Sequence, residues 1–390
     1  MFEIIDQNPQ EAVIKVIGVG GCGGNAIEHM IERQLQGVEF IAANTDAQAL
    51  KRSTARVQLQ LGSNLTRGLG AGARPEIGRD AAMEDKDRIG EMIDGADMLF
   101  ITAGMGGGTG TGAAPIVAQV AKDRGILTVA VVTRPFQFEG KRQRVAEAGI
   151  EELKKTVDSL IIIPNDKLMQ VLGEDVSVLD AYAAANDVLH SAVAGIAEVI
   201  NNPGLVNVDF ADVRTVMSEV GMAMMGSAKV GGPDRARLAA ERAVASPLLE
   251  EINLAGARGV LVNITASAGL KMKEYHEVMN TIKSFTADDA MVIVGTVIDD
   301  AMKDELRVTM IATGLGGVTA RSRQPRLEVV EHVVERTGTD GVGVSIETVD
   351  YDSLDKTPAV IRRGRTPSPA AAGSGFDASD IPAFLRKQAD

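Results

Sequence analysis

Residues 103–115, AGMGGGTGTGAAP, carry glycine at six of thirteen positions and threonine at two more. The segment follows the apolar run DMLFITA and precedes a helical pattern that starts near Thr111 to Ala114. Glycine lets backbone N–H groups approach an anion without a Cβ, and a helix N-terminus attracts negative charge. The hydroxyls of Thr109 and Thr111 add further donors. We therefore expect this loop to bind a diphosphate or triphosphate.

A second glycine run, GVGGCGGN, also joins an apolar run to a helical pattern. Its Gly18, Gly20 and Gly23 satisfy the G-x-G-x-x-G fingerprint, which opens an alternative: an NAD-dependent oxidoreductase with Glu39 or Asp46 as the ribose acid. The dinucleotide-binding fold of such an enzyme needs one phosphate loop, whereas this chain has two. The alternative therefore leaves the richer loop unexplained.

The chain lacks a Walker-type lysine, because its one Gly-Lys pair, Gly140–Lys141, has no glycine five positions earlier. We expect backbone dipoles and a bound cation, Mg²⁺, to neutralise the phosphates. The Mg²⁺ would be held mainly through phosphates and water rather than by a set of protein ligands.

Other segments after apolar runs can complete a nucleotide pocket. NTDAQAL (44–50) and GLGAGARPE (68–76) suit contacts to phosphate oxygens and metal waters, or are ordinary strand-to-helix turns. Glu139 and Arg142 stand near a strand end where a ribose could sit. A carboxylate such as Asp187 can accept hydrogen bonds from N1 and the exocyclic amine of guanine, which adenine cannot offer.

Asn165 and Tyr182 belong to the same group of candidates. Tyr182 could stack on a base. The residues alone favour a structural interpretation, in which Tyr182 is a helix residue and Asp187 a partly exposed acid.

The elements that position these residues follow an alternating strand and helix pattern, typical of a parallel sheet covered on both faces. Strands are expected at 12–20, 38–46, 56–62, 97–104, 126–133 and 158–164, and helices at 76–93, 112–124 and 141–156. The stretch 176–200 is apolar nearly all round, which predicts a buried dividing helix. Beyond it, strands within 222–314 and helices at 233–245 and 271–284 predict a second, smaller α/β domain.

The predicted organisation is therefore α/β, with five parts along the chain. They are a parallel-sheet nucleotide-binding domain (1–175), a long central helix (176–203), a second smaller α/β domain (204–316), a disordered linker (317–379) and a C-terminal peptide (380–390). The linker contains RRGRTPSPAAAGSG and shows no sustained period. The peptide places Ile381, Phe384 and Leu385 on one helical face, which is typical of a partner-binding helix or of a frayed tail.

Composition excludes several classes of protein. A net charge of −13 argues against a nucleic-acid partner. One cysteine excludes an internal disulfide, and the four histidines are scattered, so no zinc cluster is expected. The first ten residues lack a signal-peptide pattern and no long apolar run occurs, so we expect a cytoplasmic protein.

GGGTGTG at 106–112 matches the tubulin-type signature. Together with GVGGCGGN, NTDAQAL, GLGAGARPE, IPNDKL, NVDFADVRTVM and the terminal DIPAFLRKQAD, it makes the chain resemble the bacterial FtsZ branch of the tubulin/FtsZ family over residues 11–314 and the last eleven. The resemblance implies a GTPase that binds GTP or GDP and polymerises head to tail into the protofilaments of the division ring.

The resemblance also implies site residues. Phosphates, ribose and guanine would be contacted by Gly20, Gly21, Cys22, Gly23, Gly24, Asn25, Asn44, Ala71, Gly72, Ala73, Gly104, Gly106, Gly107, Gly108, Thr109, Gly110, Thr133, Pro135, Glu139, Arg142, Gln143, Asn165, Tyr182 and Asp187. Two positions depart from the family pattern. Gln143 stands where arginine is usual, so Arg142 can take that role. Cys22 replaces a usual glycine, which requires a negative φ at that position.

The segment NVDFADVRTVM (207–217) has two compatible readings. Asp209 and Asp212 fit the N-cap and third residue of a helix. In the family, residues matching Asn207, Asp209 and Asp212 enter the nucleotide site of the next subunit and orient the attacking water. The resemblance therefore implies catalysis at the junction between subunits, with GTP favouring assembly and loss of the γ-phosphate weakening the junction.

By the same likeness, residues 380–390 would bind the membrane-tethering division proteins FtsA and ZipA. Contact with the inner membrane would then be indirect, at the mid-cell division site. A filament protein without catalysis is a further alternative, and it predicts assembly that does not depend on GTP.

Overall fold

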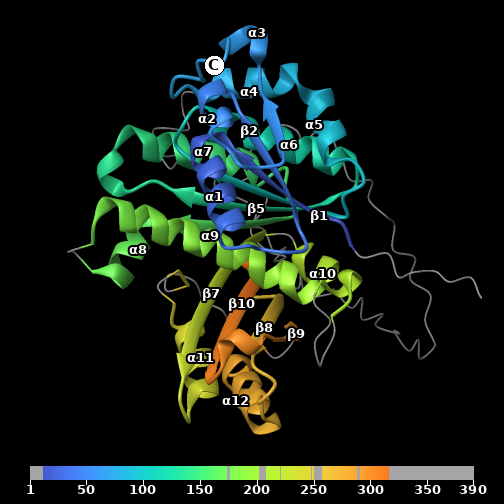
Figure 1. The fold of residues 1–390 in the computed structure, drawn as a ribbon, viewed down its shortest axis with the longest axis vertical. Coiled ribbons are helices and arrows are strands. Elements are labelled where there is room, and N and C mark those ends of the chain that lie inside the picture. The colour runs from blue at the N-terminus through green and yellow to red at the C-terminus, as the bar shows by residue number, and fades with distance from the viewer. Residues whose placement is uncertain are drawn as a thin grey trace, which may run out of the picture. The chain divides into compact units, whose positions relative to one another are not determined.

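The computed structural model describes residues 12–173, 176–201, 208–219, 221–246, 248–249, 257–287 and 290–315. These residues form a ten-stranded sheet with the strand order β3-β2-β1-β4-β5-β6-β7-β10-β8-β9 (Figure 1). The strands are β1 (Ile14–Val19), β2 (Glu39–Asn44), β3 (Val57–Gln60), β4 (Met98–Gly104), β5 (Leu127–Arg134), β6 (Ser159–Pro164), β7 (Gly221–Gly231), β8 (Gly259–Ala266), β9 (Met291–Ile298) and β10 (Glu305–Leu315).

The strands from β3 to β7 pair in parallel, as do β8 and β9, while β10 runs antiparallel to both β7 and β8. The helices are α1 (Gly20–Glu32), α2 (Ala47–Lys51), α3 (Ser63–Thr66), α4 (Pro75–Glu84), α5 (Lys86–Ile93), α6 (Thr109–Asp123), α7 (Lys141–Leu153), α8 (Asn165–Leu172), α9 (Val178–Asn201), α10 (Phe210–Met217), α11 (Arg235–Val244) and α12 (Met272–Lys283), with short 3₁₀ turns η1 (Gln137–Glu139) and η3 (Asp300–Met302). The predicted α/β class is confirmed.

Both faces of the parallel strands are buried, because successive side chains of a strand point to opposite faces. In β4, Met98 and Phe100 join the core under α1 and α9, whereas Leu99 and Ile101 join the core under α4, α5, α6 and α7. The continuous apolar runs that predicted buried strands arise from this double burial. A third core lies between β7, β8 and β10 and the helices α11 and α12.

The predicted long helix is present as α9, and its role as a divider between domains stays a prediction. Its buried Leu189 and Val193 pack into the core of the parallel strands. On another face, a Cβ added at Gly195 would lie 2.8 Å from Cγ2 of Thr309 in β10. Figure 1 shows α9 passing between the parallel strands and the β7–β10 group. One helix therefore packs against both groups of strands.

Two helix predictions were wrong in detail. The helix expected over 76–93 is two helices that meet at Asp85, whose buried carboxylate accepts a hydrogen bond from the Gly62 N–H (2.7 Å). The helix expected from residue 112 begins at Thr109, so part of the glycine loop is helical. The predicted linker and C-terminal peptide lie outside the described residues, and the domain boundaries stay a prediction.

Candidate functional site

The two glycine loops lie side by side because they follow neighbouring strands. β1 pairs in parallel with β4, and each strand leads directly into a loop that opens a helix, α1 or α6. The backbones touch: a Cβ added at Gly20 would lie 2.9 Å from the Gly110 nitrogen. Gly20 also has φ +76°, a left-handed conformation that favours glycine. The contact requires bare backbone on both loops.

The N-termini of α1 and α6 are not capped by side chains. Neither Val19 before α1 nor Gly108 before α6 makes a side-chain capping hydrogen bond, and neither helix has an acidic residue in its first turn. The first N–H groups of a helix have no partner within the helix, and their aligned dipoles carry partial positive charge. Two adjacent uncapped N-termini are a site for a multiply charged anion.

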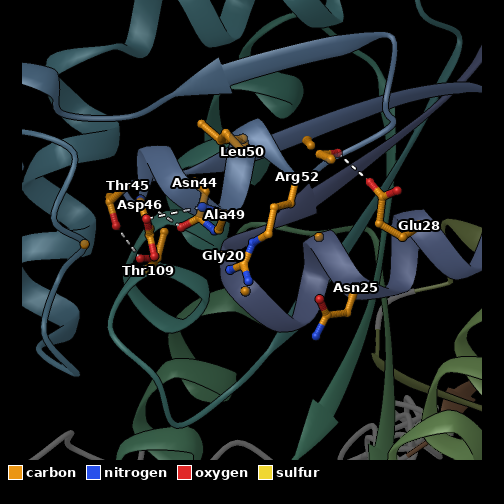
Figure 2. A pocket seen from close by; sticks show the side chains of 16 residues that line it. Gly20, Asn25, Glu28, Asn44, Thr45, Asp46, Ala49, Leu50, Arg52 and Thr109 are labelled. Atoms are coloured by element: carbon orange, nitrogen blue, oxygen red, sulfur yellow. Dashed lines mark hydrogen bonds between the residues drawn. The ribbon is translucent and has the colours of Figure 1, made fainter.

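These N-termini open on two connected cavities. The larger, about 670 Å³, is drawn in Figure 2, and the smaller is about 250 Å³. Gly21 and Thr109 line both, so the cavities are two parts of one site. The larger is lined by Gly20, Gly21, Gly24, Asn25, Glu28, Ala42, Ala43, Asn44, Thr45, Asp46, Ala49, Leu50, Arg52, Ser53, Gly70 and Thr109. The smaller is lined by Val19, Gly21, Cys22, Gly104, Met105, Gly107, Gly108, Thr109, Gly110, Thr133, Pro135, Glu139, Arg142, Asn165 and Tyr182.

Two further loops meet at the larger cavity, which Asn44 to Leu50 line in part and which Gly70 lines from the segment 68–76. Ala71, Gly72 and Ala73 line neither cavity, so their contacts with phosphate stay a prediction. The hydroxyls of Thr45 and Thr109 lie 2.6 Å apart and join the loop after β2 to the start of α6. The Gly70 N–H donates to the Thr45 carbonyl (3.2 Å), which links the third loop to the second. Ala73, with φ +56°, turns that third loop back on Gly108, where an added Cβ would lie 2.8 Å from the Ala71 methyl.

The smaller cavity has the polar and aromatic groups of a nucleoside site. Asn165 is buried, and its Oδ1 has no hydrogen-bond partner among the described residues. A buried orphan acceptor is costly unless a ligand supplies a donor. The Tyr182 ring is half exposed and packs edge-on against Phe136, with centroids 6.0 Å apart. Both residues line the smaller cavity, and their contacts with a nucleotide base stay a prediction.

Arg142, rather than Gln143, supplies the cation of the smaller cavity. Its guanidinium donates to Glu139 (2.6 Å), and both residues line the cavity. Gln143 instead donates its side-chain amide to the Pro135 carbonyl (3.3 Å) and does not line the cavity. Arg142 therefore lines the cavity where Gln143 does not, and its role toward a nucleotide stays a prediction.

The backbone at Cys22 has a conformation that residues other than glycine adopt without strain. It lies in the first turns of α1, and its φ is not positive, as its replacement of a glycine required. Its thiol lies 3.6 Å from the Thr133 hydroxyl. Burial raises the pKa of the Cys22 thiol, against the opposing effects of Thr133 and Arg142. The thiol is therefore held in its protonated form.

Asp187 does not line either cavity. Its Oδ1 accepts hydrogen bonds from His29 (2.8 Å) and Arg33 (2.7 Å) at the end of α1. The His29 ring meets the His190 ring edge-on, at 6.4 Å between centroids. Burial and the neighbouring His29 lower the pKa of His190 to about 4. The histidines, which the sequence analysis treated as scattered, include a pair in contact, and the guanine contact of Asp187 stays a prediction.

The predicted catalytic acids lie far from the cavities. Asp209 caps α10 by accepting a hydrogen bond from the Asp212 N–H (2.8 Å), which confirms the predicted helix start, and both carboxylates are exposed. Helix α6 starts at the cavity and is 15 residues long, so its last residue lies about 21 Å from its first at 1.5 Å per residue. Just beyond that end, Arg214 of α10 donates to the Gly125 carbonyl (3.2 Å). The acids therefore stand at the edge of the sheet opposite the cavity.

Asn207 lies outside the described residues. Among the residues that are described, no group of three or more His, Cys, Asp or Glu side chains is placed to hold a metal ion. In the same part of the chain, every helix is too short or too polar to cross a membrane.

Sequence reasoning missed Glu28 and Arg52, which line the larger cavity. For Glu28 a signal was available, because residues three apart share a helix face and Asn25 was already a candidate. Arg52 carried no such signal, since it follows α2, a helix that was not predicted.

Two family models match the chain. The first, described as "Tubulin/FtsZ family, GTPase domain", matches residues 13–173, and the second, "FtsZ family, C-terminal domain", matches residues 221–316. Among curated relatives, the chain is 57% identical to "Cell division protein FtsZ" of Azotobacter vinelandii and equally to that of Pseudomonas aeruginosa, over 100% of each chain. These matches give no support to the oxidoreductase alternative.

Solved structures agree with these matches. The chain is similar to "FtsZ dimer, empty (M. jannaschii)", with a TM-score of 0.75 and 42% identity over 79% of this chain and 89% of that one. It shares the fold of CetZ2 from Haloferax volcanii, with a TM-score of 0.67 and 20% identity over 78% of this chain and 93% of that one.

We expect Gly104→Ala to lower the free energy of unfolding by about 1–3 kcal/mol. The added methyl would lie 2.5 Å from Cβ and 2.8 Å from Sγ of Cys22. In a Cys22→Gly background the same change should cost less, because those atoms are gone. Urea unfolding of the four chains measures this coupling. Gly107→Ala is the control, since a Cβ there meets nothing within 4 Å. Equal costs in both backgrounds would contradict the contact.

Proposed function

The chain belongs to the tubulin/FtsZ family, and we propose that its two glycine loops hold the phosphates of GTP at a site that a second copy of the chain completes. It is a cell division protein of the FtsZ type with a tubulin-type GTPase domain. The observation that carries the proposal is the pair of uncapped N-termini, α1 and α6, opening on one cavity. A triphosphate would supply the negative charge that no capping side chain and no first-turn acid provides at these two N-termini.

We propose that the base and the ribose of the nucleotide bind in the smaller cavity. There the orphan Oδ1 of Asn165 accepts a hydrogen bond from the base, and the Tyr182 ring stacks on it. Glu139 and Arg142 contact the ribose. Asp187 lines neither cavity in this structure, and we propose that its Oδ2 accepts from guanine in the bound state, since both of its present hydrogen bonds go to Oδ1. This assignment makes the site prefer guanine to adenine.

Mg²⁺ is a separate proposal. No described cluster of acids would hold it, so it would be bound by the phosphates and by waters near Asn44 and Asp46, which line the larger cavity. When bound, it neutralises the charge that develops on the phosphates.

In this proposal, hydrolysis needs two opposite poles of the molecule: the cavity, and the edge of the sheet where Asp209 and Asp212 stand. Phosphoryl transfer is catalysed mainly by positioning and charge stabilisation. The two acids described in the lining of the larger cavity, Glu28 and Asp46, already accept hydrogen bonds from neighbouring residues. Asp209 and Asp212 stand exposed at the opposite pole, and we assign to them, with Asn207, the orientation of the attacking water in the next copy. Because the two poles differ, the contact is heterologous and its repetition produces an open filament.

The remaining proposals concern the end of the chain. We propose that residues 380–390 bind FtsA and ZipA, which would place the filament at the mid-cell division site beneath the inner membrane. The five-part division at residues 175, 203, 316 and 379 belongs to the same proposal. In it, the segment 317–379 is a spacer between the GTPase and the partner-binding peptide.

We expect Asp212→Ala to keep its affinity for GTP but to hydrolyse it about 100-fold or more slowly than the wild type. The fold should survive, because the Asp209 cap bonds the backbone N–H of Asp212 and not its side chain. Phosphate release, measured at an assembling protein concentration, tests this. Glu151→Ala, an exposed acid on α7, is the matched control. Wild-type turnover by the Asp212 variant would refute the shared site.

A chain that ends at residue 379 should hydrolyse GTP at the wild-type rate. It should not be recruited to vesicles that carry membrane-bound FtsA or ZipA, whereas the full chain should be. Sedimentation with those vesicles measures recruitment. Recruitment of the shortened chain by both partners would show that another segment binds them.

A further inference from the structure

Arg52 is the positively charged side chain of the larger cavity. Among the described residues that line this cavity, no other carries a lysine or arginine charge. Arg52 directly follows α2, and its backbone N–H ends that helix with a bond to the Ala49 carbonyl (3.2 Å). Figure 2 shows its side chain extending toward Gly20, at the first turn of α1.

The acids that line the cavity with Arg52 are bonded to other groups. Both oxygens of Glu28 accept hydrogen bonds from Ser53 and Thr54, at 2.9 and 3.0 Å from the Thr54 N–H. Although burial opposes it, these bonds lower the pKa of Glu28, which keeps it ionised. Asp46 accepts from the N–H groups of Gln48 and Ala49. Within the described part of the chain, the Arg52 guanidinium has no hydrogen-bond or ion-pair partner.

Arg52 is an exposed cation whose side chain extends toward the N-terminus of α1. A helix N-terminus carries partial positive charge, so it repels a cation beside it. A nearby anion is attracted both by the N-terminus and by the arginine. The Glu28 bonds anchor the two residues that follow Arg52, and so they hold the arginine at the cavity without neutralising it. A guanidinium beside free backbone N–H groups matches the oxygens of a phosphate.

We propose that Arg52 binds the terminal phosphate of GTP, an inference that rests on the proposed function of this site. The nucleoside groups Asn165 and Tyr182 line the smaller cavity, while Arg52 lines the larger one with Asn44 and Gly70. A nucleotide with its base in the smaller cavity extends its phosphates past Gly21 and Thr109, which line both. Its last phosphate then reaches the part of the site where Arg52 stands.

The test is nucleotide affinity of the full chain below its assembly concentration, with light scattering confirming that no filament is present. GDP and a slowly hydrolysed GTP analogue, both with Mg²⁺, are titrated by calorimetry into wild type and variants. Arg52→Ala should weaken the GTP analogue about tenfold and GDP by less than about twofold, as expected for one lost charge-assisted hydrogen bond. Arg52→Lys, which keeps the charge, should lose less.

Lys51→Ala is the matched control, because it removes the neighbouring positive charge from a residue that does not line the cavity. It should leave both affinities unchanged.

Equal weakening of both nucleotides by Arg52→Ala, or no weakening, would overturn the proposal. So would unchanged affinities with a higher assembly concentration, because Arg52 would then act between subunits. Arg52→Gln repeats the test should the alanine variant unfold. Wild-type protein that binds neither nucleotide would instead refute the proposed function.

Discussion

The site depends on the unsatisfied N–H groups at the starts of two neighbouring helices. α1 and α6 begin at the ends of adjacent parallel strands, and neither N-terminus is capped by a side chain. Parallel pairing of β1 and β4 is what brings the two N-termini together, and bare glycine backbone lets them touch. A negatively charged protein can bind a triphosphate in this way, because the attraction is local and does not depend on net charge.

The same sheet places the cavity and the exposed acids Asp209 and Asp212 at opposite edges. Helix α6 starts at the cavity and carries the chain to the opposite edge of the sheet between Thr109 and Asp123. The contact of Arg214 with Gly125 fixes α10 at that opposite edge, with Asp209 and Asp212 exposed. In the proposed function, one molecule therefore holds the nucleotide too far from its own Asp209 and Asp212 for these acids to position the attacking water. Stacked copies bring them together, and the filament is the geometric result.

The buried strands and the glycine loops between strands and helices were predictable from local sequence patterns. Runs such as DMLFITA signal buried strands, and bare glycine between a strand and a helix signals a phosphate loop. What local patterns could not show are pairings between distant residues. The break at Asp85 depends on its bond to the Gly62 N–H, and the bond between Asp187 and His29 joins helices 158 positions apart. Arg52 was missed for the same reason, because its significance comes from the acids that are already engaged around it.

The most direct test of two separated half-sites is a mixing experiment. Gly107 lines the smaller cavity, and a side chain added there meets no atom within 4 Å of its Cβ, so Gly107→Phe should block the cavity without disturbing the fold. That chain keeps its acids, whereas a chain without the Asp212 carboxylate keeps its cavity. Each alone should hydrolyse little GTP, and an equimolar mixture should recover activity at mixed junctions. A mixture no more active than the sum of its parts would contradict the account.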